Sequence, residues 1–571
     1  MALDEKTKNE IREKAELYIK SEKNENFKRE VISSLEKEDY DDLYERFYTS
    51  LSFGTAGMRG VIGGGTNRIN TFMVEKVSQG LADYLKSQEN PSCTIAYDSR
   101  HYSKEFALSA ALVLAANGVR TYLYDTLHPV PMLSFALRYL KTTSGIVITA
   151  SHNPSKYNGY KVYWQDGGQV TPPHDIEIAK RANSVKPDQI KSMSEAEARE
   201  KGILSSVPAE VDEAYYQMVK DSLRRPEYVN GAKIKVAYTP LHGTGYVPVT
   251  KMLSDFGIET HVVSSQKDPD GAFPTVKLPN PESAEAMSSV IELAKNIKAD
   301  IVLGTDPDAD RLGIAIPKNE DKSEYQLLTG NQIATLLADY LLVTELERGI
   351  KDKKPLVVKS LVTTDLVRKI AEKNGAVCRD VLTGFKYIAQ EIEKTVSGEN
   401  DKEYFLFGCE ESYGFLTVPH VRDKDAVSSA ICAVEMMCYY ASRGISLNQR
   451  LDAIYASYGY STEVVFSNDY EGSSGKAKME AIMKGYRSLE KGSVLVGRTV
   501  ESVTDLMKEN SGFPKSDVLV IRFLSGEKLV IRPSGTEPKI KYYIFLSEGA
   551  DGRAALEQRL PSIIKDFKDA L

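Results

Sequence analysis

The sequence predicts a protein of mixed α/β domains, about four in number, of which the last is built on an antiparallel sheet. The length of 571 residues corresponds to roughly four domains of about 150 residues each. Short β-rich runs alternate with helical stretches along most of the chain, which is typical of α/β domains with largely parallel sheets. Near the C-terminus, residues 517–523 and 528–531 alternate apolar and polar side chains, and this favours antiparallel strands.

The elements are expected in the following order along the chain. Residues 1 to about 50 are expected to be helical, because apolar side chains recur among charges at partly helical spacing. Strands are expected at 95–97, 120–124, 233–238, 261–264 and 299–304, and helices at 105–117, 247–256 and 283–297. Polar stretches interrupt this order near 205–212, 318–325 and 457–475. We therefore expect four domains, at 1–210 (with the N-terminal helical extension), 211–322, 323–457 and 458–571.

Composition and charge exclude several classes of protein. Hydrophobic residues make up 42% and charged residues 27% of the chain, so each domain can bury a core. The net charge of −7 argues against a protein devoted to nucleic acid, which usually has a basic balance. It does not exclude an anionic small-molecule substrate, because cations can cluster locally in an acidic protein.

The N-terminal composition, the lengths of the apolar runs and the cysteines indicate the cellular compartment. No apolar run approaches the length of a membrane span, about 18 residues, and the charge-dense N-terminus resembles neither a signal peptide nor a transit peptide. The five cysteines include no Cys-x-x-Cys pair, which predicts reduced thiols in place of disulfides or a zinc site. We expect a cytoplasmic protein with no membrane and no nucleic-acid partner.

The first candidate site follows an apolar stretch at 145–148, which is expected to be a buried strand. The stretch ends in Ser151, His152 and Asn153, and Pro154 stops regular structure. Ser151 is therefore expected on a loop at a strand end, where catalytic groups are common, although the spacing is not that of a hydrolase nucleophile elbow. A turn serine and an ordinary hydrogen-bonded histidine explain the same residues, so from this loop alone both interpretations stay open.

The second and most informative loop carries Asp306, Asp308 and Asp310 directly after an apolar run. A spacing of two residues places their side chains on one face if the chain is extended. Three neighbouring carboxylates repel one another unless a hard cation binds, and oxygen ligands of this kind suit Mg²⁺. An EF-hand would need Gly and Glu where Arg311 and Pro317 stand, which disfavours calcium sensing. A solvated acidic turn is the alternative, and the flanking apolar strands disfavour it.

The third loop offers groups that suit a sugar. Glu410 and Ser412 lie between Gly408 and Gly414, where a carboxylate and a hydroxyl can accept from and donate to sugar hydroxyls. Such residues are also common on ordinary protein surfaces, so this loop alone is weak evidence for a sugar site. Farther along the chain, Lys424 follows a histidine and an arginine. These three residues alone are also weak evidence for a functional site.

The fourth loop has the groups that hold a phosphate. It supplies a guanidinium fork, hydroxyl donors and open backbone N–H groups, from Arg532, Ser534, Gly535 and Thr536. The Walker A pattern is absent, and a hairpin turn is an equal alternative for this loop alone. The four loops occur about once per predicted domain. A metal site, a nucleophile, a hydroxyl-binding loop and a phosphate-binding loop together predict phosphoryl transfer on a sugar.

The four loops also resemble a known family. Residues 149–154, 306–311, 408–414 and 532–536 are similar, in the same order, to the signature loops of the α-D-phosphohexomutase superfamily. The resemblance spans roughly residues 50 to 571 and looks closest to the phosphoglucomutase branch. It implies a heart-shaped architecture of three mixed α/β domains and a C-terminal α+β domain with an antiparallel sheet, with the active site in the central cleft.

The resemblance assigns a role to individual residues. In the family the serine matching Ser151 is phosphorylated and contributes an oxygen to Mg²⁺. The other expected metal ligands are Asp306, Asp308 and Asp310. Lys424 resembles the proton-transfer lysine, and His152 is its partner near the serine. The residues expected to bind substrate are Arg59, Lys161, Arg311, Thr383, Gly384, Glu410, Ser412, Arg532, Ser534, Gly535, Thr536 and Lys539.

The implied reaction interconverts glucose 1-phosphate and glucose 6-phosphate through glucose 1,6-bisphosphate, which also primes an unphosphorylated serine. Pro307 and Ala309 stand where many relatives have glycine, and Cys409 precedes Glu410 where many have glycine. Phosphopentomutase or phosphomannomutase activity on the same scaffold is the nearest alternative, and a Mg²⁺-dependent phosphatase or a non-catalytic sugar-phosphate sensor is a more distant one. The expected partners are small-molecule sugar phosphates, bound by a monomer or homodimer.

Overall fold

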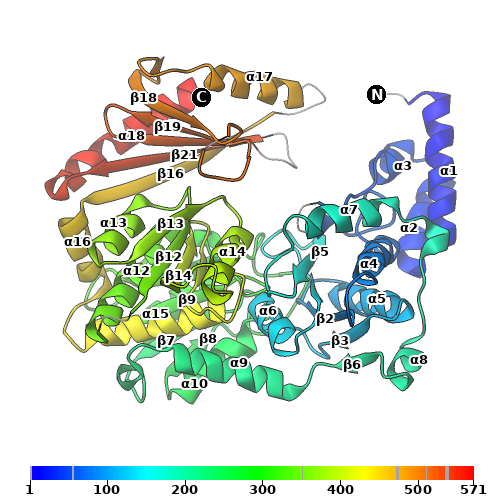
Figure 1. The fold of residues 1–571 in the computed structure, drawn as a ribbon, viewed down its shortest axis with the longest axis horizontal. Helices are drawn as coiled ribbons and strands as arrows, with labels where there is room; N and C mark the ends of the chain where they lie inside the picture. Colours follow the sequence, from blue (N-terminus) through cyan, green and yellow to red (C-terminus); the bar gives the residue numbers. More distant parts are fainter. Residues whose placement is uncertain (1–2, 55–56, 350–351, 471–474, 510, 534–538) are drawn as a thin grey trace. The chain divides into compact units, whose positions relative to one another are not determined.

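The structure, a computed structural model, describes residues 3–54, 57–349, 352–470, 475–509, 511–533 and 539–571 (Figure 1). The chain divides into two compact units. The first unit comprises Met1–Leu328, Ala389–Glu399 and Ser412–Tyr439. The second comprises Thr329–Ile388, Asn400–Glu411 and Tyr440–Leu571.

Three helices open the first unit, α1 (Glu5–Ser21), α2 (Glu25–Glu36) and α3 (Tyr40–Phe47). The side chains of Asp4, Asn24 and Asp39 each accept a backbone N–H from the first turn of the helix that follows, so each helix begins with its own cap. Buried residues of all three, among them Tyr18 and Phe27, join the core of the sheet that follows. The helical N-terminal segment is thus confirmed, as three capped helices.

A six-stranded mixed sheet comes next, in the order β1-β5-β4-β2-β3-β6. Its strands are β1 (Gly57–Val61), β2 (Ser92–Tyr97), β3 (Arg120–Leu123), β4 (Ser144–Ile148), β5 (Tyr157–Trp164) and β6 (Leu204–Ser206). The accompanying helices are α4 (Thr71–Leu85), α5 (Ser103–Ala116), α6 (Val130–Tyr139), α7 (His174–Ser184) and α8 (Glu195–Glu200). β2 pairs in parallel with β3 and β4, whereas β5 is antiparallel to β4 and β1. α5 and α6 pack against β2 and β4, so every residue of β4 is buried.

The second sheet of this unit has the order β11-β10-β9-β7-β8. Its strands are β7 (Lys235–Thr239), β8 (Glu259–Val262), β9 (Ile301–Thr305), β10 (Leu312–Pro317) and β11 (Tyr325–Leu327). Its helices are α9 (Ala209–Ser222), α10 (Tyr246–Asp255) and α11 (Ala284–Ile297). β7 pairs in parallel with β8 and β9, and α11 packs against β7 and β9. β4 and β9 are therefore both fully buried strands, and the two predicted catalytic loops follow them directly.

The first unit also contains β15 (Gly414–Leu416) and most of α15 (Ala426–Ala441). Asp425 precedes α15 and accepts the backbone N–H of Ser428 at 2.9 Å. The hydroxyl of Tyr215, on α9, donates to the same carboxylate at 2.9 and 3.0 Å from its two oxygens. Asp425 is fully buried, and this burial raises the pKa of its carboxyl to about 6.

The raised pKa of Asp425 predicts a pH-dependent effect of replacing it with asparagine. Because the folded pKa lies above the unfolded one, ionising Asp425 destabilises the fold as pH rises from about 4 to about 6. We expect Asp425→Asn, which keeps a capping oxygen, to match the wild type below pH 4 and to be more stable by about 2 kcal/mol above pH 7. Urea unfolding of both proteins at pH 4, 6 and 8 measures the difference. An unchanged difference across this range would contradict the prediction.

The second unit begins with a parallel sheet that contains the order β13-β12-β14. The elements of this part are α12 (Gly330–Glu347), β12 (Lys354–Ser360), α13 (Asp365–Lys373), β13 (Val377–Val381), α14 (Phe385–Val396), β14 (Glu403–Glu410) and α16 (Leu447–Tyr458). α14 begins in this unit and ends in the first. β12 is parallel to β13 and to β14, as the alternation of strands and helices predicts.

The C-terminal part of the second unit is an antiparallel sheet in the order β16-β21-β20-β19-β18-β17. Its strands are β16 (Tyr460–Asp469), β17 (Val494–Leu495), β18 (Arg498–Asp505), β19 (Leu519–Phe523), β20 (Lys528–Pro533) and β21 (Lys539–Glu548). Its helices are α17 (Gly475–Arg487) and α18 (Arg553–Ala570). All neighbouring strands pair antiparallel. Three sheets whose strands alternate with helices along the chain, together with this antiparallel C-terminal sheet, confirm the predicted α/β fold class. The four domain boundaries stay a prediction.

Candidate active site

Ser151 lies on the loop that follows β4, as predicted, and is buried. Its backbone N–H donates to Thr149 Oγ1 at 2.8 Å. Its φ is +50°, in the left-handed region that residues other than glycine rarely adopt. Its hydroxyl donates to Asp306 Oδ2 at 2.7 Å, and His152 Nδ1 lies 3.1 Å from Ser151 Oγ. The structure thus brings the predicted nucleophile to the predicted metal loop.

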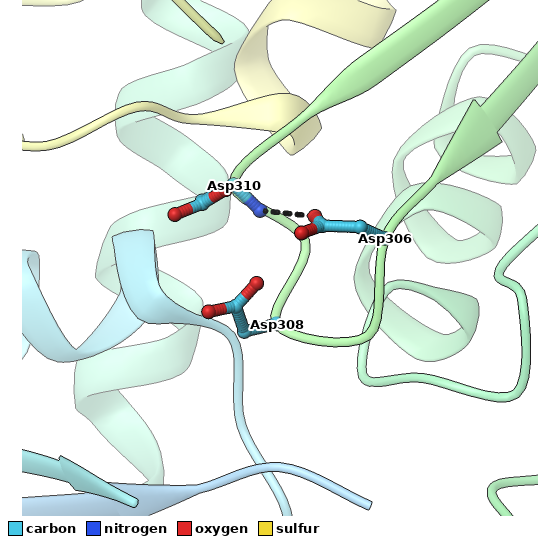
Figure 2. A group of neighbouring side chains, drawn as sticks. All are labelled: Asp306, Asp308 and Asp310. Carbon is cyan, nitrogen blue, oxygen red and sulfur yellow. Dashed lines mark hydrogen bonds between the residues drawn. The ribbon is translucent and has the colours of Figure 1, made fainter. Parts of the chain in front are cut away.

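Asp306, Asp308 and Asp310 form a buried cluster on the loop after β9 (Figure 2). One carboxylate oxygen from each lies within 4.8 Å of the other two. Thr149 Oγ1 donates to Asp308 Oδ2 at 3.1 Å, which connects the cluster to the serine loop. Asp308 Oδ1 and Asp310 Oδ1 are buried and accept no hydrogen bond from the residues that the structure describes. Such oxygens destabilise a protein unless a cation or another donor reaches them, so the donor set fits a divalent metal.

The three carboxylates converge through a turn, and the prediction that an extended chain brings them together is wrong. Residues 306–310 contain no strand. Ala309 adopts φ +50°, and Asp306 Oδ1 accepts the backbone N–H groups of Asp310 at 3.1 Å and Arg311 at 3.0 Å. An aspartate that bonds its own following backbone stabilises a turn, and this turn curls the loop around the space between the carboxylates. Ala309 in place of glycine therefore does not prevent the loop from closing.

Neighbouring segments hold the metal loop by its backbone. The N–H of Val130, the first residue of α6, donates to the carbonyl of Asp308 at 3.0 Å. The N–H of Ala426, the first residue of α15, donates to the carbonyl of Ala309 at 3.2 Å. Two helix N-termini thus use N–H groups that have no partner within their own helices. The loop is therefore fixed from several directions before any ion binds.

The aspartates have unequal proton affinities. Burial and the nearby Asp308 carboxylate raise the pKa of Asp306 well above its ordinary value, and they raise the pKa of Asp310 as well. Burial also opposes ionisation of Asp308, but Lys161 Nζ, 3.0 Å from its Oδ2, holds the pKa of Asp308 below its ordinary value. Protons therefore compete with a divalent cation for Asp306 and Asp310.

Cationic side chains surround this cluster. Lys161, on β5, bonds Asp308, and Lys424 Nζ lies 3.1 Å from Asp310 Oδ2 and 3.2 Å from Asp423 Oδ1. Arg311 pairs with Glu282 at 2.5 Å. Arg59, on β1, donates to Asn153 Oδ1 at 3.2 Å. The structure therefore brings four of the predicted cations together with Ser151.

His152 is neutral in this setting. Burial, followed by the charges of Arg311 and Arg59, lowers the pKa of His152 far below its ordinary value. A neutral imidazole has one nitrogen that accepts and one that donates. His152 Nδ1 is therefore able to accept the hydrogen bond of a serine hydroxyl.

Several residues of this site were not among the predicted ones. Thr149 connects the two loops, Glu282 pairs with Arg311, and Asp423 holds Lys424. Asp98 and Arg100 follow β2 and lie against the serine loop. Polar residues at the end of an apolar strand are the signal that indicated Ser151, and the same signal was present after β2.

A second set of predicted residues lies in the second unit. Glu410 Oε1 accepts the backbone N–H of Gly384 at 2.8 Å, so the Glu410 loop contacts the loop that also carries Thr383. Burial and Glu411 raise the pKa of Tyr543 to about 12, against the opposing charge of Arg532. The loop of Glu410 and Glu411 and the side chain of Arg532 thus act on one tyrosine. Lys539 begins β21, opposite Asp469 of β16.

The remaining predicted residues are placed less completely. Ser412 is half-buried and belongs to the first unit. Ser534, Gly535 and Thr536 lie outside the described residues. The phosphate loop is therefore described only as far as Pro533, the end of β20, and from Lys539 onward.

Sequence models of the phosphoglucomutase/phosphomannomutase family match the chain in three segments. The model of α/β/α domain I matches residues 50–189, that of domain II matches 213–319, and that of domain III matches 329–458. The chain belongs to this family. The three matched segments contain the serine loop, the metal loop and the Glu410 loop.

Curated relatives place the chain more narrowly. Phosphoglucomutases of Staphylococcus epidermidis and Staphylococcus aureus are each 38% identical to it, over 520 and 528 residues. Each alignment covers 89% of this chain and 92% of the relative. The predicted resemblance to the α-D-phosphohexomutase superfamily, in its phosphoglucomutase branch, is confirmed.

Solved structures share the fold. A phosphoglucomutase/phosphomannomutase family protein of Burkholderia thailandensis is 19% identical, with a TM-score of 0.65 over 91% of this chain and 96% of its own. The open form of parafusin, a phosphoglucomutase of Paramecium, is 17% identical, with the same TM-score over the same shares. Every helix among the described residues is too short or too polar to cross a membrane.

Proposed function

We propose that this protein is a phosphoglucomutase that interconverts glucose 1-phosphate and glucose 6-phosphate through a phosphorylated Ser151. The observation that carries the proposal is the hydrogen bond of 2.7 Å between Ser151 Oγ and Asp306 in the buried aspartate cluster. It places a nucleophilic oxygen beside a set of carboxylates that fits Mg²⁺. The names of the curated relatives support the same activity.

Asp306, Asp308 and Asp310 would hold the metal, with the serine-borne phosphoryl group as a further ligand. Mg²⁺ bound there supplies positive charge that stabilises the phosphoryl oxygens during transfer. Two of the aspartate oxygens are buried and accept no hydrogen bond within the described part of the chain, so a bound cation would satisfy them.

The residues around Ser151 move the phosphoryl group and two protons. The phosphoryl group passes from Ser151 Oγ to a hydroxyl oxygen of the bound sugar monophosphate, which forms glucose 1,6-bisphosphate. The bond between phosphorus and Oγ breaks, the sugar hydroxyl loses its proton, and Ser151 Oγ takes up a proton. Lys424, between Asp310 and Asp423, is proposed to accept the proton that the sugar hydroxyl loses. In the reverse transfer Ser151 accepts the other phosphoryl group, and neutral His152 Nδ1 accepts the hydrogen bond of the serine hydroxyl.

Cations and polar groups would bind the substrate. Lys161, Arg59 and Arg311 carry positive charge around Ser151, where a transferring phosphoryl group is negative. In the second unit Thr383, Gly384 and Glu410 are proposed to bind sugar hydroxyls, together with Ser412. The proposed ligands of the non-reacting phosphate are Arg532, Ser534, Gly535, Thr536 and Lys539. We further propose a cytoplasmic monomer or homodimer; four of its five cysteines are buried free thiols.

A comparison of substrates tests this proposal. We expect kcat/KM for glucose 1-phosphate to exceed that for mannose 1-phosphate and ribose 1-phosphate by at least about tenfold, which is a difference of about 1.4 kcal/mol in transition-state binding. The assay measures formation of the 6- or 5-phosphate with Mg²⁺, with and without glucose 1,6-bisphosphate. A higher value for ribose 1-phosphate would indicate a phosphopentomutase. Net release of inorganic phosphate from every substrate would indicate a phosphatase.

A further inference from the structure

Ser151 holds a backbone conformation that needs support. At its φ of +50° the side-chain Cβ crowds a neighbouring carbonyl, as it does in every residue except glycine. Strain of this kind persists only where surrounding contacts impose it, and it is concentrated at functional sites. The contacts that hold the loop of residues 151–157 therefore decide where Ser151 Oγ points.

The buried guanidinium of Arg100 supplies these contacts. Its Nη2 donates to the carbonyl oxygens of Ser151 and Asn153. Its Nη1 donates to the carbonyl oxygens of Pro154 and Tyr157, at 2.9 Å each. One planar group thus joins four carbonyls of the loop. A lysine ammonium has three donors on a single atom and does not reproduce this spread of directions.

Arg100 is fixed in turn by residues outside the loop. Asp98 Oδ2 lies 3.4 Å from Arg100 Nε, and Asp98 Oδ1 accepts the backbone N–H of Arg100 at 2.9 Å and the hydroxyl of Ser103 at 2.7 Å. The ring centroid of Phe273, in the segment between β8 and α11, lies 4.9 Å from the guanidinium carbon. The side chains of Asp98 and Arg100 have no solvent exposure. The support of Arg100 is therefore buried and made of several contacts.

We infer that Arg100 is the positioning residue of the phosphoserine: it holds the strained carbonyl of Ser151 so that Oγ points to Asp306 before and after each transfer. The inference rests on the proposed function, because the position of Oγ matters to turnover only if Ser151 carries the phosphoryl group. Arg100 donates to main-chain carbonyls of the loop and so acts through Ser151, without a contact to the serine hydroxyl.

The test replaces Arg100 with lysine, which keeps the charge and loses the fork. We expect Arg100→Lys to lower kcat about 100-fold, since a shift of about 1 Å in a reacting atom costs that much, and to change KM for glucose 1-phosphate less than about twofold. The rate at which glucose 1,6-bisphosphate phosphorylates Ser151, followed by intact mass, should fall by the same factor as kcat.

Arg450→Lys is the matched control. Arg450 bonds Asp339 through Nε at 2.7 Å and Nη2 at 2.6 Å and lies 5.3 Å from the ring centroid of Tyr440, so it too loses a fork and a cation–π contact. We expect Arg100→Lys and Arg450→Lys to lower Tm by similar amounts. Arg450→Lys should keep kcat within about twofold of the wild type. If Arg100→Lys keeps wild-type kcat, or if both variants lose kcat equally, the positioning role of Arg100 is wrong.

A crystal structure of Arg100→Lys separates this inference from the proposed function. We expect φ of Ser151 to leave the left-handed region and Oγ to move away from Asp306. A loop that keeps its conformation would overturn the inference whatever the enzyme does. A wild-type protein without mutase activity would instead overturn the proposed function, and the loop geometry of the variant would still decide whether Arg100 holds the serine.

Discussion

Replacing Ser151 with alanine should lower mutase turnover by at least about 10³-fold, even with glucose 1,6-bisphosphate supplied. The variant lacks the oxygen that carries the phosphoryl group, and it also loses the 2.7 Å hydrogen bond to Asp306. Because Asp306 then accepts one hydrogen bond fewer, we expect the free energy of unfolding to change by no more than about 1 kcal/mol. Steady-state formation of glucose 6-phosphate measures the turnover, and thermal unfolding measures the stability.

Ser78→Ala is the matched control for this variant. Ser78 is a buried serine of the same unit, whose Oγ lies 3.0 Å from the hydroxyl of Tyr160. We expect this control to keep kcat within about twofold and to lose about 1 kcal/mol of stability. If Ser151→Ala turned over at a rate close to that of Ser78→Ala, the phosphoserine mechanism would be refuted.

Replacing Asp306 with asparagine should separate metal binding from folding. Asp306 is fully buried beside Asp308, and this burial raises its pKa. Asparagine removes one negative charge and keeps an oxygen for the N–H groups of Asp310 and Arg311. We therefore expect the metal-free variant to be at least as stable as the metal-free wild type at pH 8, while mutase activity falls at least about 10²-fold.

The effect of Mg²⁺ on Tm distinguishes the role of Asp306 in metal binding from its role in folding. In the wild type Mg²⁺ should raise Tm, because an ion that binds only the folded state stabilises it by mass action. This rise should be absent in Asp306→Asn and intact in Asp125→Asn, which changes an exposed acid of the same unit. An equal rise in Tm for all three proteins would show that the ion binds elsewhere.

The metal loop and the serine loop were predictable from the sequence because each follows a buried strand and consists of short polar residues. Ser151 and the aspartates belong to different sheets, yet the pattern after β4 and after β9 is the same. The way in which the aspartates converge was not predictable from their spacing. It depends on a left-handed Ala309 and on backbone bonds to Asp306, which alternation along an extended chain does not describe.

Arg100 shows a different limit of sequence reasoning. Its partners are main-chain carbonyls of residues 151–157, and every residue has such a carbonyl, so no pattern of side chains points to the contact. Glu282 was missed for a related reason, since it pairs with Arg311, which lies in a different segment of the chain. The fold class was easier to predict, because strand and helix periodicity is local.

Mass spectrometry shows whether Ser151 carries the phosphoryl group. The purified chain is incubated with glucose 1,6-bisphosphate and Mg²⁺, its intact mass is measured, and the phosphorylated residue is mapped by peptide fragmentation. An excess of glucose 6-phosphate is then added and the mass is measured again. The phosphoserine mechanism predicts one phosphate per chain, on Ser151, which the sugar phosphate removes as glucose 1,6-bisphosphate in the second step. A phosphate on another residue, or one on Ser151 that the sugar phosphate does not remove, would contradict it.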